Sequence, residues 1–236
     1  DLRAVGVWLS THDNLSAPEM VDRFATDHAP LALREEALAA AEIAISAGEC
    51  IVLPTDTVYG IGAAAFDSVA VQRLLDAKHR GRDMPPPVLI AEPAMLRSLA
   101  TGLTRSGLHL AKSFWPGPLT VVVSAQAELQ LDLGDRGDTI AVRVPDHDFI
   151  RSLLRRTGPL AVSSANVSGQ PAATTIVEAI EQLGDSVSVY LDAGPGSDAV
   201  PSTIVDLTGP PRILREGRLT RHELAEAVPG LFGDDA

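Results

Sequence analysis

Apolar positions along the chain follow two periodicities, which predict strands and helices in turn. Short apolar runs predict strands at residues 49–53, 58–63 and 88–91, and within 114–125, 139–145, 160–169, 187–191, 203–207 and 212–214. Longer segments with apolar residues three or four apart predict helices at residues 34–47, 69–80, 93–100, 104–114, 149–157, 175–183 and 219–228. Because helices and strands interleave without strict alternation, we expect an α/β fold with a twisted mixed sheet.

Two of these helices have clear end signals. The first, REEALAAAEIAISA, is rich in Ala, and Gly48 follows it as a C-terminal cap. Asp67 or Ser68 caps the next helix at its N-terminus. In that helix we expect the inward-facing apolar side chains to be Val69, Leu74 and Leu75.

The pattern also divides the chain into three parts. Residues 1–33 have weak periodicity and several turn residues, so we expect an N-terminal extension with one short helix near residues 18–25. Residues 34–217 carry the regular pattern and form the expected main domain. Residues 218–236 supply a C-terminal helix and tail. With 236 residues and 45% hydrophobic composition, the chain is long enough to bury a substantial core.

The net charge of −12 changes which partners are expected. An acidic protein repels phosphate, which argues against nucleic acid as the main partner. The sequence KHRGR at residues 78–82 nevertheless gathers positive charge in one place. Such a local patch fits a small anionic ligand; the alternative is a solvated helix end.

The small numbers of cysteines and histidines and the lack of a long apolar run exclude several kinds of site and protein. One cysteine, Cys50, rules out a disulfide scaffold and a multi-cysteine zinc site, and we expect it to be buried. The six histidines form no H-x-x-x-H pair, so no protein metal site is predicted. No run of about 18 apolar residues and no signal-peptide pattern occur, so we expect a cytoplasmic protein without a membrane partner.

Polar side chains concentrate where strands end. In IVLPTDTVYGIGAAA, residues 51–65, GIGAAA imitates a dinucleotide fingerprint, but residues typical of strands flank it on both sides, so we expect no dinucleotide site. Four polar clusters remain: Thr55-Asp56-Thr57, Lys78-His79-Arg80, Ser163-Ser164-Ala165-Asn166 with Ser168, and Ser202-Thr203 followed by Arg215. Singly, each could only brace a turn. Together they predict a pocket for a phosphorylated or nucleotide ligand and a small polar molecule.

Six motifs occur in order over about residues 34–217: PTDTVYGIG, KHRGRDMPPPVLI, FWPGPLTVVV, AVRVP, SSANVSGQPAATT and PSTIVDLTG…ILREG. By these motifs the chain resembles the short form of the YrdC/TsaC family. The resemblance implies a single domain with a twisted mixed sheet, flanked by helices around a positively lined cavity. It also implies a nucleotidyltransferase that forms threonylcarbamoyl-AMP and pyrophosphate from L-threonine, bicarbonate and ATP. This reaction begins the t6A modification of tRNA at adenosine 37.

Matching positions in the motifs imply the site residues. The implied L-threonine site consists of Thr57, Arg143, Ser164 and Ser202. Lys78 and Arg80 form the K-x-R element that faces the phosphates, and they are the implied catalytic residues. The implied ATP site consists of Lys78, Arg80, Thr139, Asn166, Thr174 and Arg215. Mg²⁺ is expected mainly through the ATP phosphates. The downstream t6A transferase complex and tRNA are implied as transient partners.

Three positions depart from the family pattern, and two other functions stay open. Gly81 stands where the family commonly has Pro, Met84 where it has Asn or Lys, and Leu89 where it has His. One alternative is an RNA-binding module of the same type without this activity, although 4% aromatic residues offer little stacking surface. The other is carbamoyl transfer in hydrogenase maturation, against which the length and the single cysteine argue. No side chain is identified as a general base.

Overall fold

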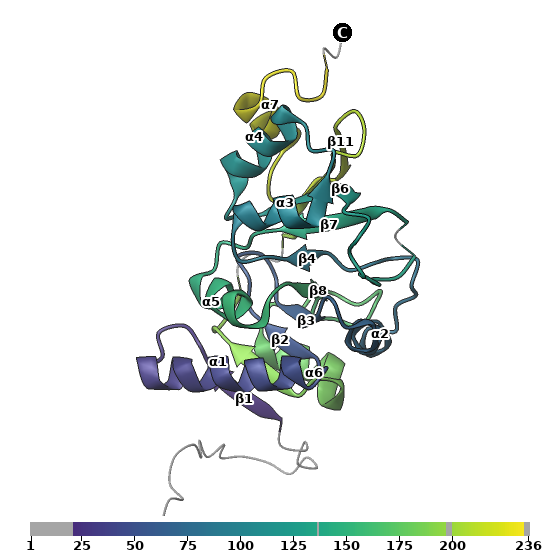
Figure 1. Ribbon diagram of the computed structural model, residues 1–236. Coiled ribbons are helices and arrows are strands. Elements are labelled where there is room, and N and C mark those ends of the chain that lie inside the picture. Colours follow the sequence, from purple (N-terminus) through teal and green to yellow (C-terminus); the bar gives the residue numbers. More distant parts are fainter. Residues whose placement is uncertain (1–20, 136, 197–199, 234–236) are drawn as a thin grey trace, which may run out of the picture.

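The structure is a computed structural model, and it describes residues 21–135, 137–196 and 200–233. Its strands stack one above another in Figure 1, from β1 near the bottom to β11 near the top. In sheet order the strands are β1 (Asp22–Ala25), β9 (Val189–Asp192), β2 (Ile51–Leu53), β3 (Gly60–Ala64), β8 (Leu160–Ser164), β4 (Val88–Leu89), β7 (Thr139–Arg143), β6 (Leu119–Ala125), β10 (Thr203–Asp206) and β11 (Arg212–Arg215). A short strand, β5 (Ala100–Thr101), pairs with β6 outside this order.

Parallel and antiparallel pairs alternate irregularly across this sheet. The parallel pairs are β1 with β9, β9 with β2, β4 with β7, and β6 with β10. The others, such as β2 with β3 and β3 with β8, are antiparallel. The expectation of an α/β fold with a mixed sheet is therefore confirmed.

The described residues contain seven α-helices, of which all but the last lie between strands. They are α1 (Leu31–Ser46), α2 (Ser68–Ala77), α3 (Leu96–Leu99), α4 (Arg105–Phe114), α5 (Asp148–Thr157), α6 (Ile176–Leu183) and α7 (Arg221–Ala227), with 3₁₀ turns at Pro93–Met95 and Gly184–Ser186. None of them is long and apolar enough to cross a membrane.

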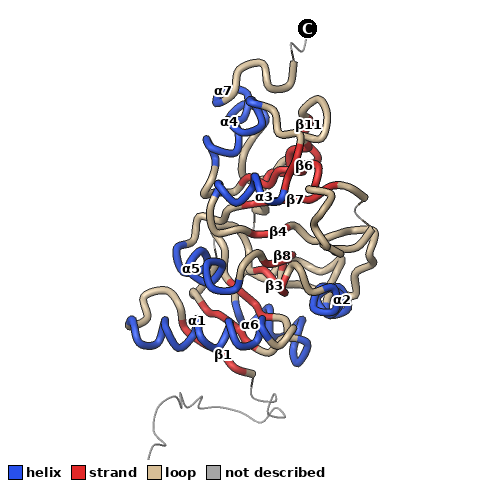
Figure 2. Tube along the Cα trace, in the orientation of Figure 1, coloured by secondary structure: helices blue, strands red, loops and turns tan. Residues whose placement is uncertain are grey.

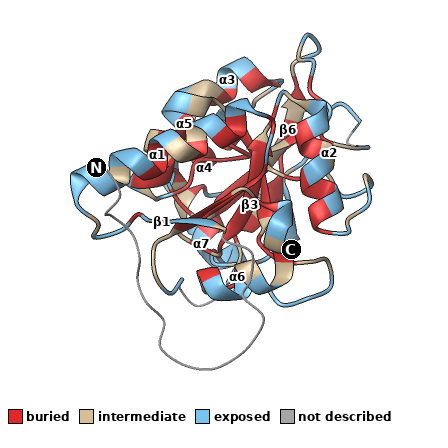
Figure 3. Cartoon of the chain, turned by 90° about the horizontal axis from the view of Figure 1, so that it is seen from below, coloured by how far each residue is buried: buried red, intermediate tan, exposed pale blue. Residues whose placement is uncertain are grey.

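Successive side chains on each strand point to opposite sides of the sheet, so both faces carry apolar residues. Helices cover both of these faces. On β2, Ile51 and Leu53 pack into the cluster beneath α1 and α5, whereas Val52 belongs to the cluster that contains residues of α2, α4, α6 and α7. Figure 2 shows α5 and α2 on opposite sides of β3 and β8. Figure 3 shows buried strands at the centre and helices whose outer surfaces are exposed.

Several expected elements differ from those observed. The prediction of a helix near residues 18–25 is wrong for the part of this segment that the structure describes, because Asp22–Ala25 forms the strand β1. This strand pairs in parallel with β9, and Arg23 forms an ion pair with Asp192. The first long helix begins at Leu31 rather than at residue 34. Val69 is also not inward-facing, since 61% of it is exposed, whereas Leu74 and Leu75 are buried.

Two glycines of the GIGAAA segment serve packing inside the sheet. A Cβ on Gly60 would lie 2.6 Å from a methyl of Val162, and a Cβ on Gly62 would lie 2.9 Å from a methyl of Leu53. Both distances are too short for van der Waals contact, so only glycine fits between the flanking strands. The segment is the strand β3 itself, and no helix opens from it. A dinucleotide fingerprint also requires a helix that starts directly after the strand.

Candidate active site

A cavity of about 620 Å³ opens on the face of the sheet that carries α1 and α5. Its floor follows from strand alternation: on β6, Thr120 and Val122 line the cavity, whereas Val121 and Val123 lie in the core on the other face. A similar alternation on β7, β10, β3 and β8 brings their polar side chains into one space, although Ile140 of β7 and Ser163 of β8 also line it. The cavity-lining positions of these strands and their ends include Thr57, Gly60, Thr139, Arg143, Val162, Ser164, Ser202 and Ile204.

The cavity is positively charged although the chain is acidic. Its described lining contains three arginines, Arg80, Arg143 and Arg215, and no aspartate or glutamate. Residues with hydroxyl groups, two amide residues (Asn166 and Gln170) and apolar residues make up the rest, including Pro85–Pro87 and Leu89. Among the described residues, no group of three or more His, Cys, Asp or Glu side chains could hold a metal ion. This arrangement suits an anionic, partly apolar ligand.

Arg143 is the most firmly held of the three arginines. Its Nε donates to the carbonyl of Gly117 at 3.0 Å, Nη1 donates to Thr57 Oγ1 at 2.9 Å, and Nη2 pairs with Asp56 at 2.6 Å. Burial lowers the pKa of the Arg143 guanidinium, and the nearby Asp56 carboxylate opposes that shift. A guanidinium has five N–H donors. These three contacts therefore leave one N–H on each terminal nitrogen for a ligand.

The turn after Pro54 fixes the hydroxyl of Thr57. Thr55 Oγ1 donates to the carbonyl of Val58 at 2.7 Å and accepts from the amide of Thr57 at 3.1 Å. Since the Thr55 proton is used in this way, Thr57 is the donor in the 3.0 Å contact between the two hydroxyls. Thr57 Oγ1 thus accepts from Arg143 and donates to Thr55. The Thr-Asp-Thr sequence is a support for Arg143 as well as part of the cavity wall.

Arg80 and Arg215 are each held by a single residue, Ser163 and Ser202, whereas Arg143 contacts three. Arg80 Nη1 donates to Ser163 Oγ at 2.8 Å, but its buried Nε has no partner among the described residues. Arg215 Nη2 donates to the carbonyl of Ser202 at 2.8 Å. Burial lowers the pKa of both guanidinium groups, and for Arg215 the charges of Arg143 and Arg80 lower it further. An anion between these three arginines would relieve their mutual repulsion.

Lys78 is buried beneath the cavity rather than in its lining. Only 2% of the residue is exposed, and Nζ donates to the main-chain carbonyls of Ser164 and, at 2.6 Å, Asn166. Burial lowers its pKa to about 8, with a smaller contribution from Arg80. Lys78 therefore ties the end of α2 to the loop after β8. Its ammonium group holds two carbonyls that would otherwise be hard to satisfy.

Asn166 presents an oxygen that lacks a partner. Its Nδ2 donates to the carbonyls of Val167 and Gln170, both at 2.9 Å, which fixes the orientation of the amide. The buried Oδ1 has no hydrogen-bond partner among the described residues. Thr139 lines the cavity, but Thr174 does not, and its hydroxyl donates to Glu178 at 2.9 Å.

Comparison with known proteins decides the family. A sequence model of the Sua5/YciO/YrdC family, described as "Telomere recombination", matches residues 43–217. The chain belongs to this family. A Mycobacterium tuberculosis protein provisionally named a threonylcarbamoyl-AMP synthase is 49% identical over 205 residues, which span 85% of this chain and 94% of that protein. The threonylcarbamoyl-AMP synthase of Pyrococcus abyssi is 37% identical over 197 residues, or 80% of this chain and 58% of that protein.

Solved structures agree with this assignment to the Sua5/YciO/YrdC family. Pyrococcus abyssi Sua5 complexed with L-threonine matches with a TM-score of 0.82 and 33% identity, over 88% of this chain and 61% of that one. Escherichia coli YciO matches with a TM-score of 0.75 over 89% of this chain and all of that one. At 22% identity, this second match shows the shared fold alone.

Of the residues implied by the motifs, the structure brings eight to the cavity lining: Thr57, Arg80, Thr139, Arg143, Ser164, Asn166, Ser202 and Arg215. Lys78 and Thr174 lie outside that lining. Sequence reasoning missed Thr120, whose hydroxyl lies 2.8 Å from that of Ser202, and did not assign Asp56 or Ser163 a role of its own. The signal for Thr120 was present, because it is the polar residue at the start of the apolar run LTVVV. Asp56 and Ser163 stood within recognised clusters, but their partners are distant in sequence.

Proposed function

We propose that the protein is an L-threonylcarbamoyladenylate synthase, which forms threonylcarbamoyl-AMP and pyrophosphate from L-threonine, bicarbonate and ATP. The observation that carries the proposal is the triple arginine cavity in a chain of this family, where each cation has a separate hydroxyl or carbonyl support. Relatives named threonylcarbamoyl-AMP synthase support the reaction. The threonine complex of Pyrococcus abyssi Sua5 supports the amino-acid substrate.

Arg143 is the proposed partner of the threonine carboxylate. Its two remaining N–H groups lie on different nitrogens, which suits a two-pronged contact with a carboxylate. Thr57, Ser164 and Ser202 complete the proposed threonine site with hydroxyl groups. Such groups orient a polar ligand without adding charge.

Arg80 and Arg215 are the proposed contacts of the ATP phosphates, with Thr139 and Asn166 facing the nucleotide. The partnerless Arg80 Nε requires an acceptor and Asn166 Oδ1 requires a donor, and a nucleotide offers both. We propose that Lys78 adds positive charge and shapes the loop through the carbonyls of Ser164 and Asn166. Thr174 would reach ATP only if its hydroxyl exchanged Glu178 for the ligand.

The chemistry needs positioning and charge neutralisation more than side-chain acid or base groups. The unprotonated amine of threonine captures carbon dioxide, which forms from bicarbonate and a proton with loss of water, and the resulting carbamate releases one proton. A carbamate oxygen then attacks the α-phosphorus of ATP, so that pyrophosphate leaves. Both reactants are anionic, and arginines fixed before the reaction lower the barrier to their approach. Hydroxyl oxygens in the lining fit a Mg²⁺ ion that would arrive with the phosphates and be held mainly by them. That ion would neutralise phosphate charge.

Further proposals concern the boundaries and partners of the enzyme. We propose that residues 34–217 form the catalytic domain, which the family match to residues 43–217 supports. Residues 1–33 are the proposed extension, although Asp22–Ala25 joins the sheet, and residues 218–236 are the proposed helix and tail. The downstream t6A transferase complex and tRNA are proposed transient partners. The cytoplasmic location stays a prediction.

Amino-acid preference tests the proposed substrate. A site that hydrogen-bonds the threonine hydroxyl leaves buried polar groups unpaired when valine binds, and such sites discriminate by roughly 10⁴-fold or more. Serine lacks only a methyl group, which costs about 1–3 kcal/mol. Initial rates of pyrophosphate release with ATP, bicarbonate and each amino acid should rank threonine first, serine second and valine far behind. Equal rates for threonine and valine would show that the hydroxyl-lined site does not bind the amino acid.

A further inference from the structure

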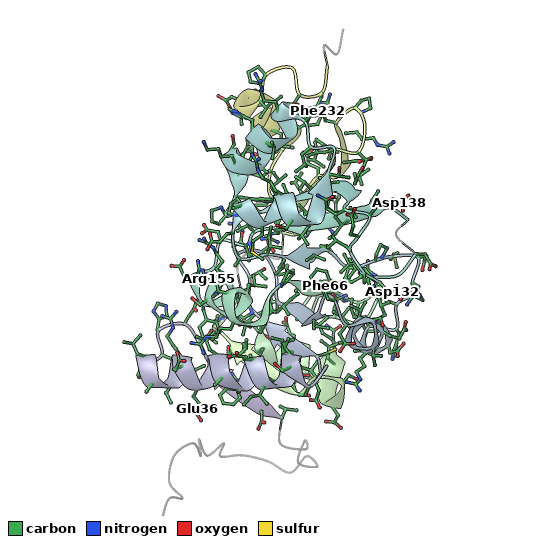
Figure 4. The ribbon with its side chains drawn as sticks, in the orientation of Figure 1. Glu36, Phe66, Asp132, Asp138, Arg155 and Phe232 are labelled. Atoms are coloured by element: carbon green, nitrogen blue, oxygen red, sulfur yellow. The ribbon has the colours of Figure 1, made fainter. Side chains whose placement is uncertain are left out.

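Arg82 is the basic residue of KHRGR for which the proposed reaction has no use. It does not line the cavity, and 39% of its side chain is exposed. Its guanidinium nevertheless joins two elements: Nη1 donates to Gln72 Oε1 on α2 at 3.1 Å, and Nη2 pairs with Asp132 in the loop between β6 and β7. Asp135 lies 3.8 Å from Nε. Figure 4 shows Asp132 close to α2 at one edge of the molecule.

The main chain repeats this connection. The amide of Asp135 donates to the carbonyl of Arg82 at 2.7 Å. Gly134 lies so close to that carbonyl that a Cβ would collide with it, and its φ of +117° favours glycine. The loop therefore binds the segment after α2 through side chains and backbone together.

Leu133, next to the acidic anchor, is where this connection reaches the cavity. It is 1% exposed and lines the cavity, and Pro85–Pro87 of the segment after Arg82 line it as well. The β6–β7 loop carries no regular structure at Leu133, so the wall is held by the packing of Leu133 in the hydrophobic core together with the loop's polar anchors. One polar anchor of the described loop is the ion pair of Arg82 and Asp132.

We propose that Arg82 is a positioning residue, which through its ion pair with Asp132 helps to hold Leu133 in place as an apolar wall of the cavity. The inference rests on the proposed function for the identity of the ligand, ATP. The ion pair of Arg82 and Asp132 is itself present in the protein without ligand. Arg82 then contributes to ATP binding without touching ATP, through the position of Leu133.

Hydrogen exchange of the ligand-free protein tests whether the ion pair of Arg82 and Asp132 holds the loop in place. Arg82→Ala should speed amide exchange at residues 131–135 about tenfold, while Arg97→Ala, at an exposed position on α3, should leave it unchanged. Asp132→Asn serves as a milder second variant. The reversed pair Arg82→Asp with Asp132→Arg should return exchange toward the wild-type rate. Unchanged exchange in both Arg82→Ala and Asp132→Asn would overturn the proposal.

Calorimetric titration with ATP tests whether the ion pair of Arg82 and Asp132 affects ATP binding through Leu133. Arg82→Ala and Leu133→Ala should each weaken binding about tenfold, or about 1.4 kcal/mol. The double variant should be no weaker than either single variant, because both changes remove the same wall. Additive losses would mean that Arg82 acts on ATP binding independently of Leu133, which contradicts the proposal. If the wild-type protein bound no ATP, the proposed function would be overturned instead. The exchange rates would still show whether the ion pair of Arg82 and Asp132 holds the loop.

Discussion

Each arginine in the cavity depends on its supports to a different degree. Arg143 has three protein contacts, so its position is set before any ligand arrives. Arg80 has one, and its buried Nε has no partner among the described residues. A buried donor without a partner destabilises the free protein, so a phosphate that accepts from it is bound more tightly. Arg80 is thus the residue whose contacts improve most when an anion binds.

Removing Arg80 should therefore impair the reaction strongly. Arg80→Ala should lower kcat/KM by on the order of a hundredfold, about 2.7 kcal/mol, which is the scale for one fixed donor to a developing charge. Threonine binding in the absence of ATP should change little, because Arg143 keeps its own supports. Steady-state rates and a threonine titration check both halves. Turnover at the wild-type rate would show that Arg80 does not face the reacting phosphate.

Lys78 makes the stability of the protein depend on pH. Burial lowers its pKa in the folded state to about 8 from an ordinary value of 10.5, so between these values the unfolded chain binds the extra proton. Stability rises with pH wherever the unfolded state binds more protons. The unfolding free energy of the wild type minus that of Lys78→Met should therefore increase from pH 8 to pH 10, by at most about 1.4 kcal/mol per unit. Denaturant unfolding of both proteins measures this difference. A difference that stays constant over this range would contradict the lowered pKa.

Among the elements, β10 and β11 shape the end of the cavity through a close backbone approach. A Cβ on Gly217, just after β11, would collide with the carbonyl of Pro201 and lie 2.7 Å from the carbonyl carbon of Ser202. The amide of Gly217 donates to Thr203 Oγ1 at 2.9 Å. The glycine of ILREG therefore lets the segment after β11 pack against the residues that carry Ser202 into the cavity.

A methyl group at this position should destabilise the fold. Gly217→Ala should lower the free energy of unfolding by about 1–3 kcal/mol, the usual cost of forcing extra atoms into a packed site. Gly209→Ala is the matched control, because nothing lies within 4 Å of a Cβ there, and it should change stability by less than about 0.5 kcal/mol. Denaturant melts of the two variants test the difference. Equal stability of both would show that the backbone near Pro201 yields at no cost.

The hydrophobic pattern predicted the elements well where their own side chains determine them. Leu74 and Leu75 are buried on α2, and Asp67 accepts from the amides of Val69 and Ala70 as a helix cap. The strand β1 could not be predicted in this way, because DRFA is mostly exposed and owes its conformation to pairing with β9. Local pattern contains no information about a partner more than 160 residues away.

The same limit applies to the site. Hydroxyl clusters at strand ends identified Thr57, Ser164 and Ser202 as neighbours of one pocket, and all three line it. Asp56 pairs with Arg143, which is distant in sequence, so the role of Asp56 depends on the fold. Lys78 contacts main-chain carbonyls, and a sequence motif does not identify such partners. Sequence thus predicted which residues gather, but not which of them support the others from outside the cavity.

At the scale of the whole molecule, a chain of net charge −12 keeps three arginines in one cavity whose described lining has no carboxylate. Such a cavity concentrates small anions while the remaining surface repels large ones. This contrast favours an enzyme for threonine carboxylate, bicarbonate and ATP over a module that binds RNA along its surface.

Product analysis with purified protein tests this account most directly. ATP labelled in the adenine ring should be converted to threonylcarbamoyl-AMP, with AMP as its hydrolysis product, and pyrophosphate should be released in equal amount. This should occur only when L-threonine and bicarbonate are both present, because the attacking oxygen belongs to the carbamate formed from them. Release of ADP and phosphate, or equal turnover without threonine, would contradict the assignment of the arginine cavity to this reaction.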